Sequence, residues 1–315
     1  FKESIRINGK DSDDPDVNAD TTVQEKNITF PTDSKLHKKM IKKTLKIVQD
    51  EQLPIRQSYT RILKKLSVDQ RFRNHPRNKS KARKADKKVK TIAGRLVREL
   101  ERNLSPDSIH QKTILFFKQV LTQTRGSKHK IYSLHEPDVL CISKGKEHKK
   151  YEFGNKVSIV KTQNTGVIVG AMGFRNEFDG HTLKPALEQV NRMIGKEPKT
   201  VSVDRGYRGN TQIGATQVQI PKPFNDKKQT KYLQKKLKEA HRKRAGHLKT
   251  DHRLGRNFYK GIIGDNINIM LAAAAFNFKR MMNKWKSSFF VFIQNLFTQL
   301  YCCRLNWIIR SKIAF

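Results

Sequence analysis

The stretch VSIVKTQNTGVIVGAMGFRNEFDGHTLKPALEQVNRMIGKEPKTVSVD, residues 157–204, contains the change of hydrophobic period that decides the fold class. Short runs rich in β-branched residues predict strands at Val157–Lys161, Thr165–Gly173 and Thr200–Asp204. Between the last two strands, apolar residues recur at helical spacing and predict a helix over His181–Ile194. Strands with a helix between them indicate an α/β layer.

Further strands are predicted on both sides of this stretch, at Val139–Ser143 and Thr216–Ile220, and a first strand far upstream at Val17–Val23. A helix rich in small apolar residues is predicted at Ile262–Met282, and such a helix can pack closely on a sheet. We therefore expect one sheet covered by helices.

Between the first strand and the others, the sequence predicts an all-helical block at residues 36–125. Apolar residues recur at helical spacing from Leu36 to Val48 and from Val89 to Leu104, and a further helix is predicted at Ile109–Leu121. The expected domains are the start of the α/β domain at 1–35, a helical insertion at 36–130, the rest of the α/β domain at 131–286 and an apolar tail at 287–315.

The chain is strongly basic, with 66 Lys plus Arg against 28 Asp plus Glu, a formal net charge of +38 and a pI near 10.3. Solubility needs a charge of only about 2–8 on a small domain, so this excess indicates a polyanionic partner. Nucleic acid fits better than a membrane surface, because no basic amphipathic anchor is found at the N-terminus. The cationic run at 71–90 is either a solvated surface or a surface that contacts phosphates.

The two ends and the cysteines indicate the compartment. The N-terminus has no initiator Met and no apolar signal core, so we expect the chain to begin inside a longer protein. Cys141, Cys302 and Cys303 form neither a ligand set nor a disulfide framework, which favours the reducing cytoplasm. Polar residues interrupt the apolar segment Ser288–Ile309, so we expect a buried or poorly folded terminal helix there and no membrane span.

Two aspartates lie in predicted strands: Asp20 in VNADTTV and Asp204 at the end of the strand in KTVSVDRGYRG. An aspartate at the carboxyl end of a core strand, followed by a glycine-containing turn, can meet a ligand at the edge of an α/β sheet. Aspartate is also a favoured N-cap and turn residue, so Asp204 could equally cap the next element. The spacing does not decide between these two interpretations.

Four segments together resemble transposases of the insertion sequence five group: ADTTVQEKNITFPTDSKLHKKMIKK (19–43), HEPDVLCISKGKEHKKYEFGNKVSIV (135–160), VSVDRGYRG (201–209) and GHLKTDHRLGRNFYKGIIGDNINIMLAAAAFNFKRMM (246–282). The resemblance runs from about residue 3 to about residue 290. These transposases belong to the DDE class. The resemblance implies an α/β fold, an RNase-H-like mixed sheet with flanking helices and a helical insertion after the first strand.

The resemblance implies that Asp20 is the first catalytic aspartate and Asp204 the second, on neighbouring strands with their carboxylates facing each other. Two divalent cations held about 3.5–4 Å apart would activate the attacking oxygen and stabilise the leaving oxygen. Hard carboxylate oxygens suit Mg²⁺ or Mn²⁺. The implied reaction is metal-dependent cleavage and transfer of DNA strands at insertion-sequence ends, by a bacterial protein that associates with the nucleoid and with a second copy of itself.

The chain departs from the family pattern at the third catalytic carboxylate. In the family this residue is a Glu that follows an Arg after three intervening residues and precedes a Lys by six intervening residues. Here Arg244 matches the Arg and Lys249 the Lys, but four residues separate them where ten are expected. Six residues are therefore missing, and the Glu is among them. Glu239 and Asp251 are the nearest acids, and at about 100° per residue neither regains the position of the lost Glu.

The family usually has a helical DNA-binding region ahead of the first aspartate, where this chain has only 19 residues, so specific recognition of inverted repeats is not expected. The expected function is a DDE transposase that is inactive in this copy. The alternatives are a catalytically silent DNA-binding remnant and an unstable product. The residues expected to contact DNA, which could otherwise form a solvated cationic surface, are Arg205, Tyr207, Arg242, Lys243, Arg244, Lys249, Arg253, Arg256 and Lys260.

Overall fold

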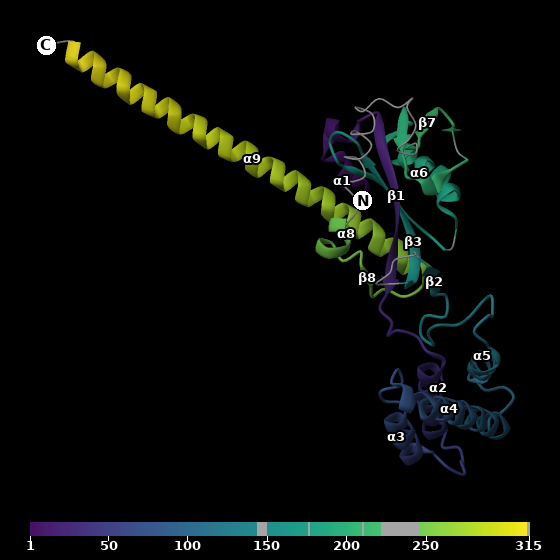
Figure 1. The fold of residues 1–315 in the computed structure, drawn as a ribbon. Helices are drawn as coiled ribbons and strands as arrows, with labels where there is room; N and C mark the ends of the chain where they lie inside the picture. The colour runs from purple at the N-terminus through teal and green to yellow at the C-terminus, as the bar shows by residue number, and fades with distance from the viewer. Residues whose placement is uncertain (144–149, 176, 210, 222–245, 314–315) are drawn as a thin grey trace. The chain divides into compact units, whose positions relative to one another are not determined.

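The computed structural model describes residues 1–143, 150–175, 177–209, 211–221 and 246–313. It divides into two compact units (Figure 1). Unit 1 comprises Phe1–Lys26 and Ile142–Phe315, and unit 2 comprises Asn27–Cys141. Unit 1 contains the long strands and unit 2 consists mainly of helices.

Unit 1 is built on one mixed sheet. Its strand β1 (Asp16–Lys26) pairs antiparallel with β3 (Tyr151–Thr162) and parallel with β5 (Thr200–Ser202). Outside these, β4 (Ile168–Phe174) is antiparallel to β3, and β7 (Thr216–Gln219) is parallel to β5. The short strands that complete the sheet are β2 (Leu140–Ser143), β6 (Gln212–Ile213) and β8 (Arg256–Asn257). The predicted α/β class with a mixed sheet is confirmed.

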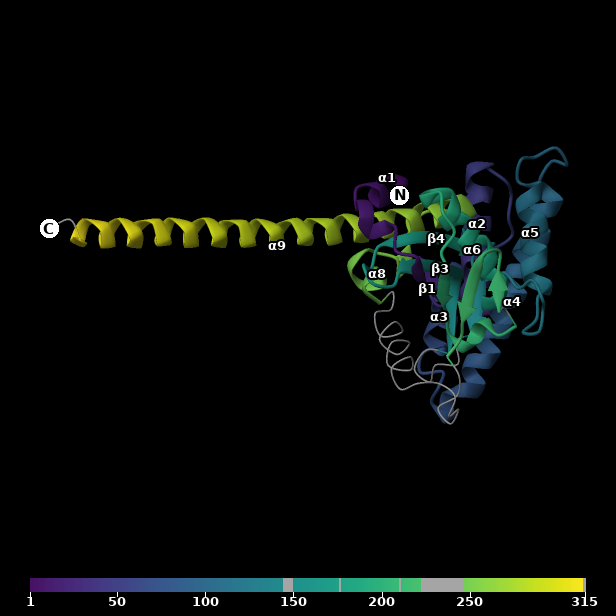
Figure 2. The ribbon, with the colours of Figure 1, turned by 90° about the horizontal axis from the view of Figure 1, so that it is seen from above.

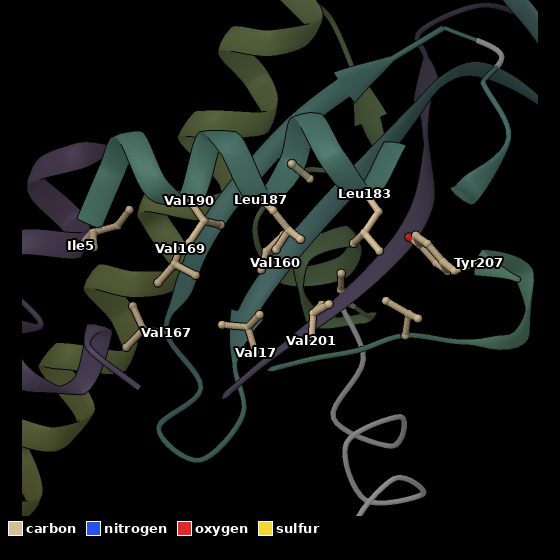
Figure 3. Close-up of a cluster of buried hydrophobic side chains, with 13 residues drawn as sticks. Ile5, Val17, Val160, Val167, Val169, Leu183, Leu187, Val190, Val201 and Tyr207 are labelled. Atoms are coloured by element: carbon tan, nitrogen blue, oxygen red, sulfur yellow. The ribbon is translucent and has the colours of Figure 1, made fainter. Parts of the chain in front are cut away.

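Helices cover both faces of this sheet. One core contains Val160 of β3 together with Leu183 of α6 (Asp179–Ile194), and a second contains Ile159 of β3 together with Ile269 of α9 (Gly261–Ile313). Successive residues of a strand point to opposite faces, so α6 and α9 lie on opposite sides. Figure 3 shows the first of these clusters, here called the α6-side core, packed between α6 and the strands. The second, here called the α9-side core, also includes Leu248 and Leu254 next to the short helix α8 (Gly246–Asp251).

The first residues of the chain form two short elements that the sequence pattern did not predict, α1 (Lys2–Arg6) and the 3₁₀ helix η1 (Gly9–Ser12). Figures 1 and 2 both show α1 beside α9. Asn277 of α9 donates hydrogen bonds to the Ser4 hydroxyl at 3.3 Å and to the Ile168 carbonyl at 2.8 Å. These long-range contacts hold α1, and a helix so short has no periodic pattern of its own.

Unit 2 confirms the predicted helical block. Its helices are α2 (Asp33–Asp50), α3 (Thr60–Asp69), α4 (Pro76–Asn103) and α5 (Gln111–Thr122). Most of the cationic run at 71–90 belongs to α4, where Ala82, Ala85 and Val89 are buried. Small residues give this basic segment a packing face, so it is an amphipathic helix and not a loop.

One helix within the described part of the chain, Gly261–Asn295 of α9, is long and apolar enough to cross a membrane by length and composition. Ile269, Ala272 and Ala273 bury its first part against the sheet, which is the behaviour of a core helix. Further along, Phe289 and Phe290 are 61% and 68% exposed. The terminal segment is helical as predicted, but these two side chains are exposed within the described part of the chain.

A buried polar cluster fixes the end of β1. The Lys26 ammonium lies 2.6 Å from Oδ1 of Asp265 in α9, and both side chains are only 4% exposed. Asn155 and Asn257 donate further hydrogen bonds to the same carboxylate, and Lys26 also donates to the Tyr259 carbonyl at 3.0 Å. Because each charge is buried with its partners, removing one partner leaves the other uncompensated.

We expect Asp265→Ala to lower the free energy of unfolding by about 3–5 kcal/mol, because it strands the Lys26 charge in the interior. The double variant Lys26→Met, Asp265→Leu should be more stable than Asp265→Ala. Glu3→Ala, which removes the exposed Arg6–Glu3 pair, is the control and should cost less than about 1 kcal/mol. Urea unfolding followed by circular dichroism measures all three. Equal losses for Asp265→Ala and Glu3→Ala would contradict the expectation.

Unit 2 contains a buried histidine, His37 of α2, which is 4% exposed. Burial lowers the pKa of its imidazole, and the nearby Asp33 carboxylate acts in the opposite direction. The unfolded chain therefore binds more protons than the folded chain between the lowered pKa and the ordinary value of about 6.5. The stability that neutral His37 contributes is fully present above the ordinary pKa of about 6.5. It is lost as the pH falls from there through the lowered pKa of the folded chain.

The stability of the wild-type chain should fall more between pH 7 and pH 5 than that of His37→Gln, whose side chain does not titrate. Urea unfolding of both proteins at the two pH values, followed by helical circular dichroism, measures this difference. If both lose the same stability, His37 is not the group responsible.

Candidate active site beside β1 and β5

The two candidate aspartates lie at the same level of neighbouring strands. The parallel pairing of β1 with β5 ends at Asn18 opposite Ser202. Asp20 and Asp204 each lie two residues farther along their segments. Because parallel strands keep their register, continuing this pairing by two residues puts Asp20 opposite Asp204.

Strand alternation predicts that both aspartates point to the same side of the sheet. Ala19 and Val203 belong to the α6-side core, so by alternation the residues that follow them, Asp20 and Asp204, point toward the α9 side. The cross-strand partner of Asp20 in β3 is Ile159, which belongs to the α9-side core. Alternation thus predicts that the two carboxylates lie on one side of two adjacent segments.

Asp204 also caps the element that follows it. It is the N-cap residue of the 3₁₀ turn η2 (Arg205–Tyr207), and its Oδ1 accepts a hydrogen bond of 2.9 Å from the Gly206 amide. The capping interpretation and the ligand interpretation are compatible, because the cap uses one carboxylate oxygen and fixes the direction of the other.

Tyr207 occupies a core position. Its side chain is fully buried in the α6-side core, and Figure 3 shows the ring directed toward β1. Burial raises the pKa of its phenol well above the usual range, and the charges of Asp179 and Asp20 raise it further. The predicted contact of Tyr207 with DNA is contradicted, because the ring has no exposed surface. The sequence shows only an aromatic residue in a polar turn, which does not reveal the burial.

A third carboxylate, Asp179 at the start of α6, lies beside this turn. Its Oδ1 accepts a hydrogen bond of 2.7 Å from the Thr21 hydroxyl and lies 3.0 Å from the Lys156 ammonium. A Cβ atom on Gly206 would lie 3.0 Å from Oδ2 of Asp179 and 3.0 Å from Oδ1 of Asp204. In the sequence Asp179 resembles an ordinary acidic residue at a helix start, so its pattern did not mark it as part of a site.

The remaining basic candidates lie on exposed segments or on α8. Lys249 of α8 is half-buried, and its ammonium lies 3.9 Å from Oε1 of Glu152. β8 places Arg256 opposite Glu25 at the end of β1. The exposed candidates are Arg205, Arg253, Arg256 and Lys260. The candidates Arg242, Lys243 and Arg244 lie outside the described residues, as does Glu239.

The residues present fit a divalent cation in part. Asp20 and Asp204 offer hard oxygen donors from adjacent strands, which suits Mg²⁺ or Mn²⁺. Across the parts of the chain with described positions, no group of three or more His, Cys, Asp or Glu residues is arranged to hold a metal ion. Within the described residues, Asp20 and Asp204 are thus two candidate carboxylate ligands.

Comparisons with known proteins identify the family of the chain. The profile of the family described as "Transposase DDE domain" matches residues 124–304, which include Asp179 and Asp204 but not Asp20. An uncharacterized protein, ORF8 in the nfe locus of Rhizobium meliloti, is 43% identical over 61 residues, covering 19% of this chain and 30% of that protein. No solved structure matches the chain. Since the family profile covers more than half of its residues, the chain belongs to the family of transposases with a DDE domain.

Proposed function

We propose that this chain is a DDE transposase unit that binds DNA and holds a divalent cation through Asp20 and Asp204, and that this copy does not cleave or transfer DNA at insertion-sequence ends. The metal site is supported by the parallel pairing of β1 with β5, because register and alternation predict that the two aspartates, each two residues beyond it, lie at the same level and on the same side. DDE transposases typically use a divalent metal, and their family implies DNA as the partner.

The chain's own residues would divide the work at this site. Asp20 is held by the long β1–β3 pairing, and Asp204 by its cap on the Gly206 amide, so both carboxylates are oriented before a cation binds. Bound divalent cations supply activation of the attacking oxygen and stabilisation of the leaving oxygen. The exposed Arg253, Arg256 and Lys260 lie on the segment between α8 and α9, where they could contact phosphates.

The inactivity follows from the predicted deletion between Arg244 and Lys249. Removing six residues shortens a helix by about 9 Å and changes its phase by about 120°. The lost Glu would have been the third charged ligand, and in-line displacement depends on both cations being held in geometry. Two carboxylates are enough for one cation and leave the second without its ligand.

Rebuilding the missing segment tests this part of the proposal. An insertion of six helical residues that places Glu four positions after Arg244 should give cleavage of transposon-end DNA in Mg²⁺ or Mn²⁺, while the unmodified chain gives none. Asp204→Asn in the rebuilt chain is the control and should abolish cleavage. If the unmodified chain cleaves as fast as the rebuilt one, and Asp204→Asn stops it, another acid such as Glu239 supplies the third ligand and the inactivity proposal is wrong.

A second candidate function, a catalytically silent DNA-binding remnant, draws support from unit 2. A pocket of about 530 Å³ lies between α2 and α3, with Ile41, Leu45 and Leu63 among its apolar lining residues. Lysine side chains on phosphates would supply sequence-independent affinity there without any metal. No acidic residue lines this pocket, and its five lysines are Lys35, Lys38, Lys39, Lys42 and Lys64. Metal-dependent nicking by the unmodified chain would exclude this second function.

Both candidate functions require DNA binding that weakens steeply with salt. The logarithm of the affinity for duplex DNA should fall with the logarithm of salt concentration by about 0.9 per phosphate neutralised. Replacing Arg253, Arg256 and Lys260 by Gln should reduce that slope. Replacing the exposed Lys2, Lys10 and Lys196 by Gln changes the net charge equally and is the control. Fluorescence anisotropy with labelled duplexes measures both, and an affinity that does not change between low and physiological salt would rule out DNA binding of this kind.

A further inference from the structure

We propose that Asp179 is a positioning residue, which connects the turn after Asp204 to β1 beside Asp20 and so fixes the two metal-binding aspartates relative to each other. This inference rests on the proposed function, because it concerns the same site. The Asp179 carboxylate contacts Thr21 in β1, Lys156 in β3 and the position of Gly206 in η2. One side chain thus reaches three separate elements around the site.

The contact with β1 acts on the strand position next to Asp20. The Thr21 hydroxyl donates to Oδ1 of Asp179 at 2.7 Å, on the α6 side of the sheet. Because neighbouring strand residues point to opposite sides, this bond fixes the backbone from which Asp20 points to the α9 side. The Lys156 ammonium, 3.0 Å from the same oxygen, balances the charge of Asp179. The Lys156 side chain is 13% exposed and the Asp179 side chain 30%, so this pair is partly shielded from water.

The contact with the turn acts on Asp204. Gly206 lies close to the carboxylates of both Asp179 and Asp204: an added Cβ would lie 3.0 Å from an oxygen of each, which is a tight contact. Since both oxygens lie at that distance from one point, they are no farther apart than twice that distance. The Gly206 amide at the same time donates to Asp204. The exposed residue Gly206 is therefore flanked by the two acids, so we expect a shift of Asp179 to affect the turn.

The base of this arrangement is rigid. Tyr207, the next residue, is buried in the α6-side core together with Leu183 of α6. The Thr182 hydroxyl donates to the Asp179 carbonyl at 2.8 Å, which fixes the first turn of α6. Asp179 is thus held at a defined place relative to both β1 and the turn. A continuous set of contacts runs from Asp20 through Thr21, Asp179 and Gly206 to Asp204.

A simpler role for Asp179 is stabilisation of α6, because an acid in the first turn interacts favourably with the helix dipole. That role needs the charge of Asp179 but not its bond to Thr21. The two roles therefore differ in the effect of Thr21→Val, which keeps the shape of the side chain and removes the donor. They also differ in a second readout: the positioning role predicts that metal affinity falls when amide exchange in the turn becomes faster, and the helix-dipole role does not.

The chain contains a matched control for Thr21→Val. At the start of β5 the Thr200 hydroxyl donates to Oδ1 of Asp16 in β1 at 2.6 Å. Thr200→Val thus removes a threonine–aspartate bond that involves the same strand, away from the turn. Thr21→Val should speed amide hydrogen exchange at Arg205–Arg208 and weaken Mn²⁺ binding by about 10–100-fold, as expected when a partner of a ligand is lost. Thr200→Val should leave both unchanged.

The measurements use the full chain, with hydrogen exchange read by mass spectrometry and Mn²⁺ binding by electron paramagnetic resonance. Asp179→Ala should reproduce both effects, and adding Thr21→Val to it should add nothing, because both remove the bond between the Thr21 hydroxyl and the Asp179 carboxylate. Equal effects of Thr21→Val and Thr200→Val would overturn the inference. In a chain whose Mn²⁺ binding depends on Asp20 and Asp204, faster exchange in Thr21→Val with unchanged Mn²⁺ affinity would overturn it as well, since Asp179 would then serve only the fold.

The proposed function fails by a different result. If Mn²⁺ binding to the unmodified chain is insensitive to Asp20→Asn and to Asp204→Asn, the two aspartates hold no cation. Exchange in the turn then decides the positioning role of Asp179 by itself. Faster amide exchange at Arg205–Arg208 in Thr21→Val, but not in Thr200→Val, then supports that role. Unchanged exchange in Thr21→Val overturns it.

Discussion

The register of β1 is the constraint on which the rest of unit 1 depends. Its antiparallel pairing with β3 runs from Val17 to Glu25, and its parallel pairing with β5 includes Asn18. Side chains alternate along the strand, so Ala19 enters the α6-side core while Asp20 points to the other side. A slip of one residue would place Asp20 in an apolar core, at a large desolvation cost. The packing of the sheet therefore determines where the carboxylate is presented.

The second part of the site depends on how the chain leaves β5. Val203 and Tyr207 are both buried in the α6-side core, which holds the turn between them against the sheet. Asp204 is thus fixed at a strand end while its carboxylate points away from that core. The Tyr207 phenol is uncharged at neutral pH, and burial together with the nearby acids raises its pKa further, so it adds no charge beside them. Core packing and site geometry are here produced by the same short segment.

The charge excess is compatible with a packed helical unit because its helices bury small and aliphatic residues on one face only. In α4, Ala82, Ala85 and Val89 are buried within a segment rich in lysine and arginine. Long basic side chains can then extend to solvent around that narrow face. The pocket between α2 and α3 has the same composition, apolar inside and lysine-rich around it. Such surfaces suit a polyanion, which is the partner that the family implies.

The spacing of apolar residues along the sequence predicted the α/β class and the helical insertion. The four segments that resemble transposases predicted the family and the choice of Asp20 and Asp204 as candidates. These properties depend on local residue order, which the sequence displays directly. Tertiary structure alone decided that Tyr207 is buried, that α1 packs beside α9 and that Asp179 lies against Gly206. Thr21 and Asp179 are 158 residues apart, and Ser4 and Asn277 are 273 apart. Neither pair has a periodic signal, because contacts across such separations arise only when the sheet brings distant segments together.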